Sequence, residues 1–128
     1  MKASDKVNIL LVDDQPAKLL SYEVILGGLG ENLIKAGSAR EALEYLLKTE
    51  IAVILVDVCM PETDGFELMR CIRERENRDE RIPALALTAF ARAEDRKRAI
   101  LSGYQAHVAK PFDTSELIVM VAGLVGKT

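Results

Sequence analysis

Five short apolar segments alternate with segments of helical periodicity along this chain of 128 residues. Apolar runs of this length, bounded by turn signals, are typical of strands that are buried on both faces of a parallel sheet. Strict alternation with helices predicts an α/β domain with helices on both faces and right-handed crossovers. The predicted strands span residues 7–12, 33–36, 51–56, 84–87 and 106–109.

Four of these predicted strands run directly into residues that can bind phosphate or metal. Asp13 and Asp14 follow the first strand, Asp57 the third, Thr88 the fourth and Lys110 the fifth. In an open α/β sheet, ligands bind just beyond the carboxyl ends of the strands. A flavodoxin-like order, 2-1-3-4-5, would place the first and third strands beside its switch point, although the pattern alone leaves the order open.

The predicted helices carry recognisable start and stop signals. Pro16 suits a first helical turn, and Ser38 with Glu41 forms a capping box. A polar helix is expected over residues 90–102, and one of residues 113–115 caps the last helix. The expected apolar stripes contain Leu19, Leu20, Val24 and Leu26; Ala42, Leu43, Leu46 and Leu47; Leu68, Met69 and Ile72; Ile100 and Leu101; and Leu117, Met120, Val121 and Leu124.

Composition bounds the class of protein. The length predicts a single domain over residues 1–128, with a core from about 7 to 125. A formal charge of −3 argues against direct binding of nucleic acid. Cys59 and Cys71 match no disulfide framework or zinc motif, which indicates reduced thiols and a cytoplasmic protein. No apolar stretch approaches the roughly 18 residues that membrane insertion requires.

The polar strand ends suggest one particular chemistry. Three carboxylates at one sheet edge repel one another unless a cation lies among them, and oxygen-rich sites suit Mg²⁺. Asp57 can attack phosphorus and become an aspartyl phosphate. Mg²⁺ and the Lys110 ammonium would offset charge on the phosphoryl oxygens, and the Thr88 hydroxyl can donate to one of them.

The joint pattern resembles the response-regulator receiver domain of two-component signal transduction. Asp13-Asp14, Asp57, Thr88-Ala89 and Lys110-Pro111 occur in the order and spacing of that family. Met60-Pro61 and Asp64-Gly65 match its M-P-x-x-D/N-G loop. The resemblance extends from about Val7 to Val125, and it implies the flavodoxin-like (βα)5 fold.

The resemblance also implies a function, in which Asp57 accepts a phosphoryl group from a phosphohistidine on a sensor kinase or phosphotransfer domain. Asp14 would be the main direct Mg²⁺ ligand, Asp13 would act mostly through water, and the Cys59 backbone carbonyl would complete the protein ligands. The expected protein is a signalling switch that slowly hydrolyses its own phosphate, not a turnover enzyme on small molecules. The expected phosphoryl-binding groups are Thr88, Lys110 and the backbone of Ala89, and the expected loop residues are Pro61, Gly65 and Pro111.

Two departures from the family pattern concern how the signal is relayed. His107 stands where the family often carries a switching Tyr or Phe that works with Thr88. It is interpreted either as a partly exposed strand residue or as a pH-sensitive substitute for the aromatic switch. Cys59 and Phe90 flank the expected phosphorylation site and are expected to tune the phosphate lifetime.

The last two helices are the expected output surface. Few apolar anchors in the helix at 90–102 indicate low local stability, as expected of a segment that shifts. The last helix carries further apolar residues, so it is either broadly buried or pairs with a second receiver or a kinase domain. With residues 126–128 following that helix, the chain is expected to be a stand-alone receiver or the receiver of a hybrid kinase.

Three other functions fit the sequence less well. An aspartyl phosphatase generally needs an Asp two residues after the nucleophile, where this chain has Cys59. A phosphorylation-independent interaction module typically loses Asp57 or Lys110, and both are present. A flavin carrier needs a Ser/Thr/Gly-rich phosphate loop after the first strand, which is absent from the sequence.

Overall fold

The computed structural model describes residues 6–58, 65–76, 81–88 and 93–126. Its strands form one parallel sheet in the order β2-β1-β3-β4-β5, which confirms the predicted flavodoxin-like topology. The strands are β1 (Asn8–Val12), β2 (Asn32–Ala36), β3 (Val53–Asp57), β4 (Ala84–Thr88) and β5 (Ala106–Ala109).

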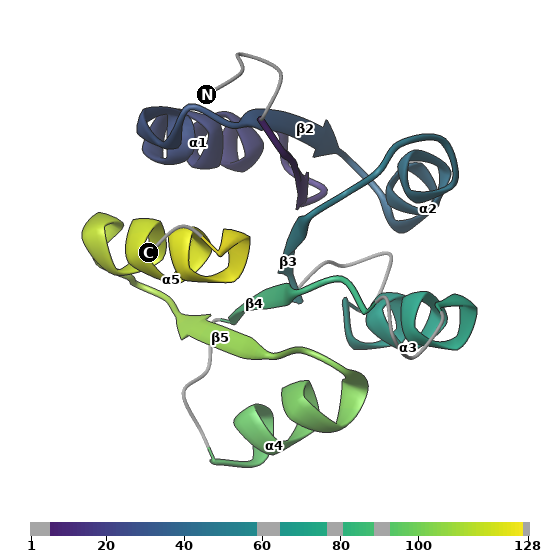
Figure 1. Ribbon diagram of the computed structural model, residues 1–128. Coiled ribbons are helices and arrows are strands. Elements are labelled where there is room, and N and C mark those ends of the chain that lie inside the picture. The colour runs from purple at the N-terminus through teal and green to yellow at the C-terminus, as the bar shows by residue number, and fades with distance from the viewer. Residues whose placement is uncertain (1–5, 59–64, 77–80, 89–92, 127–128) are drawn as a thin grey trace.

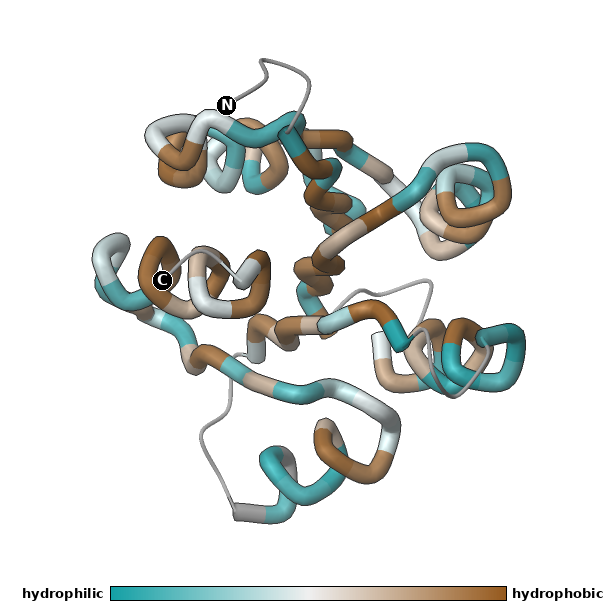
Figure 2. The backbone as a smooth tube through the Cα atoms, viewed as in Figure 1, coloured by the Kyte–Doolittle hydropathy of each residue, from teal (hydrophilic) through white to brown (hydrophobic). Residues whose placement is uncertain are grey.

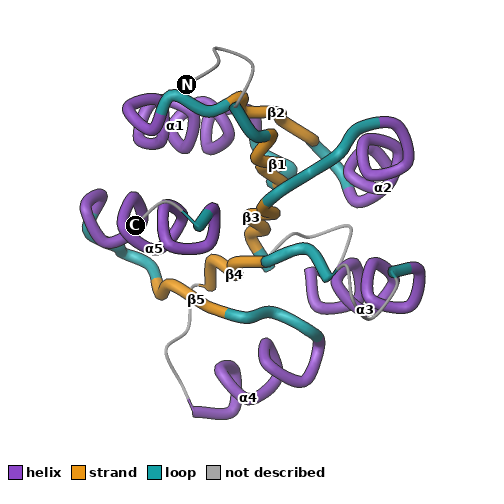
Figure 3. The backbone as a smooth tube through the Cα atoms, viewed as in Figure 1, coloured by secondary structure: helices purple, strands orange, loops and turns teal. Residues whose placement is uncertain are grey.

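The helices cover both faces of this sheet (Figures 1 and 3). Helices α1 and α5 pack on one face, whereas α2, α3 and α4 pack on the other. None of the described helices has both the length and the apolar character needed to cross a membrane. The helices are α1 (Pro16–Leu26), α2 (Ala39–Lys48), α3 (Gly65–Arg75), α4 (Ala93–Ser102) and α5 (Thr114–Val125), and the short 3₁₀ helix η2 (Gly27–Leu29) follows α1.

The core is divided by the sheet into two apolar clusters. Successive side chains of a strand point to opposite faces. Thus Ile9 and Leu11 pack with α1 and α5, whereas Leu10 and Val12 pack with α2 and α3. The hydrophobic strands run through the middle of the molecule (Figure 2). The sheet is therefore buried on both faces, which is why its strands have continuous rather than alternating apolar sequences.

The buried face of α1 differs from the predicted stripe. Leu20 and Val24 are exposed, Val24 by 75%, whereas Tyr22 is buried together with Leu19 and Leu26. Residues 19, 22 and 26 follow the spacing of three and four that defines one helix face. The prediction was wrong because it counted apolar residues and omitted the tyrosine, whose ring is apolar although its hydroxyl is polar.

The anchors of α4 were also predicted incorrectly. Ile100 and Leu101 are exposed, and the buried contacts come from Ala99 and from Tyr104 just beyond the helix. The guanidinium of Arg98 lies 4.3 Å from the centroid of the Phe66 ring. On α2, Leu47 is likewise exposed and not part of the buried face. Helical phase, which apolar content alone does not define, accounts for these differences.

The local capping predictions are confirmed where the structure describes them. Ser38 Oγ accepts a 3.1 Å hydrogen bond from Glu41 N, so the Ser38 half of the predicted capping box is present. Of the three candidates for α5, Asp113 is the cap, because its Oδ1 accepts from Ser115 N at 3.2 Å. These bonds satisfy backbone N–H groups that the first helical turn leaves without partners.

Candidate functional site

The carboxyl end of the sheet brings four of the predicted site residues to one edge. Asp13 directly follows β1, Asp57 is the last residue of β3, Thr88 is the last residue of β4, and Lys110 directly follows β5. Backbone bonds continue past the strand ends, since Lys110 N donates to Thr88 O at 2.8 Å. The parallel ladder therefore determines where each of these residues lies.

Asp57 is buried at this edge and faces two lysines. Its side chain is 2% exposed, and its Oδ2 lies 2.5 Å from Lys110 Nζ and 3.7 Å from Lys18 Nζ. Lys110 comes from the end of β5 and Lys18 from the first turns of α1. A buried carboxylate is tolerated where cations and hydrogen bonds compensate for its lost hydration, and these ammonium groups provide part of that compensation.

Asp13 is fully buried and is held by two donors. Gln15 N donates to its Oδ1 at 3.0 Å, and the Tyr22 hydroxyl donates to its Oδ2 at 2.8 Å. Burial raises the pKa of Asp13 above its ordinary value, the two hydrogen bonds oppose that rise, and the charge of nearby Asp57 adds to it. Burial, followed by the bond to Asp13, also raises the pKa of Tyr22.

Asp14 follows Asp13 in the chain and is half-buried. Its side chain makes no hydrogen bond or ion pair among the described residues. Within those residues, no three His, Cys, Asp or Glu side chains already form a group that could hold a metal. Two buried carboxylates that repel each other, Asp13 and Asp57, nevertheless offer the oxygen donors that a hard divalent cation prefers. The donor set therefore fits Mg²⁺.

The comparisons with known proteins agree with this geometry. The family model of the response regulator receiver domain matches residues 9–122. The chain belongs to this family. Over 122 residues, the receiver domain is 43% identical to the uncharacterized 14.6 kDa protein in the sodA1 3′ region of Leptolyngbya boryana, with 94% of this chain and 92% of that protein covered.

Two further relatives connect the receiver domain to two-component signalling. It is 32% identical to the response regulator Rre1 of Synechocystis, with 97% of this chain but only 54% of that protein covered. A solved receiver domain of the sensor histidine kinase PA1611 from Pseudomonas aeruginosa superimposes with a TM-score of 0.82 at 32% identity, covering 94% of this chain and 98% of that one. That structure has a magnesium ion coordinated in its active-site cleft.

Gly65 of the receiver domain is required by a close approach. A Cβ at this position would lie 2.6 Å from the Cα of Val58, directly after β3. Gly65 begins α3, so the absence of a side chain lets this helix start against the strand that carries Asp57. Of the other expected loop residues, Pro111 is exposed after Lys110, with a cis bond between them, and Pro61 lies outside the described residues.

The relay residues are only partly described. Thr88 is 6% exposed at the end of β4, and His107 is half-buried on β5 opposite Ala86. Cys59, Ala89 and Phe90 lie outside the described residues. The switch function of His107 and the tuning functions of Cys59 and Phe90 therefore stay predictions.

Lys18 and Tyr22 contact the buried carboxylates, and neither was predicted from the sequence. They lie four residues apart on α1, in the first turns after the acidic pair. A lysine and a tyrosine at this spacing share a helix face. This spacing after Asp13-Asp14 could have indicated that Lys18 and Tyr22 face the acidic site. It was overlooked because the buried face of the helix was predicted to contain Leu20 and Val24.

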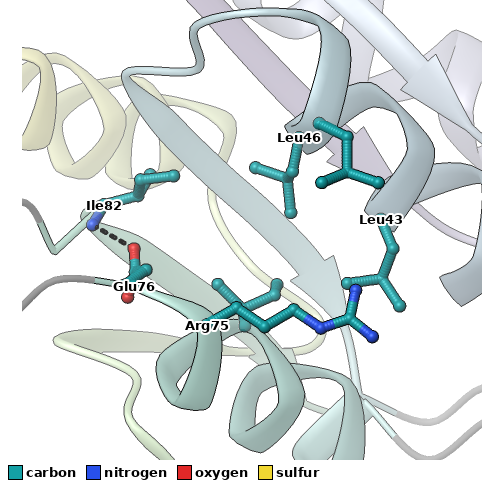
Figure 4. Close-up of a pocket in the computed structure, with 7 residues that line it drawn as sticks. Leu43, Leu46, Arg75, Glu76 and Ile82 are labelled. Carbon is teal, nitrogen blue, oxygen red and sulfur yellow. Dashed lines mark hydrogen bonds between the residues drawn. The ribbon is translucent and has the colours of Figure 1, made fainter.

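An apolar pocket of about 150 Å³ lies elsewhere, between α2 and α3 (Figure 4). Glu76 at its edge accepts a 2.7 Å hydrogen bond from Ile82 N, which precedes β4. The pocket is thus at the amino ends of the strands and includes none of the predicted site residues. Its lining consists of Leu43, Leu46, Leu47, Ile72, Arg75, Glu76 and Ile82.

Proposed function

We propose that this receiver domain is a phosphoacceptor switch in which Asp57 takes a phosphoryl group from a phosphohistidine on a sensor kinase or histidine phosphotransfer domain. The observation that carries the proposal is the contact of the buried Asp57 with Lys110 at the carboxyl end of the sheet. Membership of the receiver family supports the same conclusion. The chain spans about half the length of several curated relatives. Any statement about the signal output of this domain is therefore part of the proposal.

In the proposed reaction, a carboxylate oxygen of Asp57 forms a bond to phosphorus while the phosphorus–nitrogen bond of the donor breaks. The donor imidazole keeps the electron pair of that bond and takes up a proton. Lys110 transfers its ion pair from the carboxylate to the new phosphoryl oxygens, and the Thr88 hydroxyl and Ala89 backbone N–H donate to them. Water later cleaves the acyl phosphate slowly, releasing inorganic phosphate and restoring Asp57.

Mg²⁺ is the proposed cofactor, held directly by Asp14, Asp57 and the Cys59 backbone carbonyl, and through water by Asp13. When bound, it would offset negative charge on the carboxylates and on the phosphoryl oxygens. The mutual repulsion of the buried carboxylates of Asp13 and Asp57 supports the presence of a cation at this site. Hydrogen bonds already engage both oxygens of Asp13, which supports its binding through water and not directly. The bound magnesium of the related receiver domain of PA1611 is consistent with this.

The proposed output is a change in the surface formed by β5 and the last two helices. Thr88 ends β4 opposite Ala109 of β5, so a phosphoryl group that draws its hydroxyl inward would act beside the strand that carries His107. Ile100 and Leu101 on α4 and Val119 on α5 are exposed apolar side chains. We propose that a homodimer forms through this surface. We also propose that the protein works in the cytoplasm.

Mass spectrometry of the intact protein tests the central step. After incubation with acetyl phosphate and Mg²⁺, the wild type should gain the mass of one phosphoryl group, and Asp57→Asn should gain none. Asp113→Asn is the matched control, because it makes the same change at an exposed cap where Asn also functions. Equal labelling of Asp57→Asn and wild type would remove the proposal.

A further inference from the structure

Helix α1 directs two side chains from one of its faces at the acidic end of the sheet. Lys18 Nζ lies 3.7 Å from Asp57 Oδ2, and the Tyr22 hydroxyl donates a 2.8 Å hydrogen bond to Asp13 Oδ2. Residues four apart lie one above the other on a helix. Each buried carboxylate therefore contacts one group from α1, and these groups offset part of the cost of burying it.

The groups around the two carboxylates differ in how easily they can move away. The side chain of Lys18 is 41% exposed, compared with 22% for Lys110, and Tyr22 is buried. A partly exposed ammonium on a flexible stem can return to water at small cost. The Tyr22 hydroxyl cannot move into water in this way, because its ring is packed in the apolar cluster between α1 and the sheet. Lys18 is thus the displaceable cation, and Tyr22 is the fixed donor.

We propose that Lys18 is an internal counter-cation of the phosphoacceptor site, which a divalent cation must displace from Asp57, and that Tyr22 is a positioning residue that holds Asp13. This inference rests on the proposed Mg²⁺-dependent function. The ammonium and a divalent cation are both attracted to the Asp57 carboxylate and repel each other, so they compete for it. The chain thereby lowers its own affinity for Mg²⁺ and limits the charge repulsion of the metal-free state.

Calorimetric titration of the full chain with Mg²⁺ at constant ionic strength tests the role of Lys18. Lys18→Met should bind Mg²⁺ about three- to tenfold more tightly than wild type, and the difference should shrink in high salt because the pair is partly exposed. Lys48→Met is the matched control: it removes the same charge from an exposed position at the end of α2, and it should bind within twofold of wild type.

Thermal unfolding tests the role of Tyr22 without relying on phosphorylation. Tyr22→Phe leaves a buried Asp13 oxygen without its donor, so its loss of stability should be largest without Mg²⁺ and should shrink as Mg²⁺ saturates the site. Tyr104→Phe is the control, since the Tyr104 hydroxyl donates a buried 2.8 Å bond to a backbone carbonyl, Gly65 O. Its loss of stability should not depend on Mg²⁺ in this way.

The outcomes separate this inference from the proposed function. A wild type that binds Mg²⁺ and is phosphorylated, with Lys18→Met binding as weakly as Lys48→Met, overturns the counter-cation role alone. Equal Mg²⁺ dependence of Tyr22→Phe and Tyr104→Phe overturns the positioning role of Tyr22. A wild type without Mg²⁺ binding or phosphorylation overturns both this inference and the proposed function.

Discussion

Lys110 pairs with Asp57 across a strand that neither residue belongs to. Lys110 follows β5 and Asp57 ends β3, and β4, which ends in Thr88, lies between them in the sheet. The ion pair therefore passes over the end of β4. A phosphoryl group on Asp57 would insert into this pair directly beside Thr88, which is the arrangement that a switch based on both residues needs.

Replacing Lys110 by Met should destabilise the metal-free protein, because buried Asp57 loses its nearest cation. We expect the free energy of unfolding in urea to fall by about 1–3 kcal/mol, the range for removing one partner of a charged hydrogen bond, since Lys18 still faces the carboxylate. Lys48→Met should change it by less than about 0.5 kcal/mol as an exposed substitution. Equal stability of the two variants would contradict the inferred strength of the Lys110–Asp57 pair.

Asp13→Asn should stabilise the metal-free protein at neutral pH. Because burial raises the pKa of Asp13 above 3.8, the folded state binds its proton more tightly than the unfolded state, so ionised Asp13 costs stability as the pH rises above that value. The neutral amide avoids this cost: its oxygen can accept from Gln15 N, and its NH₂ can donate to the Tyr22 oxygen.

The stabilisation by Asp13→Asn should therefore decline as the pH is lowered, because Asp13 of the folded wild type then takes up its proton. Melting temperatures of both proteins between pH 4 and 8, without divalent cations, measure this dependence. Asp113→Asn is an exposed control that should show no corresponding gain at neutral pH. A pH-independent difference between Asp13→Asn and wild type would show that the pKa of Asp13 is not raised.

Gly65→Ala should be strongly destabilising because the added Cβ would lie 2.6 Å from the Val58 Cα, and the backbone there has to shift. We expect a loss of about 1–3 kcal/mol in urea unfolding, as for other overpacked sites. Gly123→Ala is the matched control: Gly123 is exposed on α5 and nothing lies within 4 Å of its Cβ position, so a gain of about 0.5–1 kcal/mol is expected. A tolerated Gly65→Ala would refute the close approach of α3 to β3.

Amide exchange in α4 should change when a phosphoryl mimic such as beryllofluoride is bound. Helix α4 contributes Ala99 as its buried apolar anchor among the described residues and follows the strand that ends in Thr88, so it is the helix expected to repack. Exchange measured by mass spectrometry should change in peptides from 93–102 and stay constant in 39–48, which form α2. Unchanged rates in both regions would contradict a relay through α4.

Local interactions explain what could be predicted from the sequence. A strand buried on both faces needs a continuous apolar run, and its end is marked by the first polar residue. The positions of Asp13, Asp57, Thr88 and Lys110 at the sheet edge were predicted for this reason. The cap at Ser38 was also predictable, because the acceptor and the donor are three residues apart in the chain.

Only the tertiary structure decided which side of each helix is buried and what that side contacts. The orientation of α1 about its own axis buries Tyr22 instead of Leu20 and Val24. The same orientation places Lys18 near Asp57. Small rotations of a helix change its contacts without changing its apolar content, so composition and spacing leave them open. The sequence determined the strands and the polar residues at their ends, whereas packing of α1 against the sheet decided which of its side chains contact the buried carboxylates.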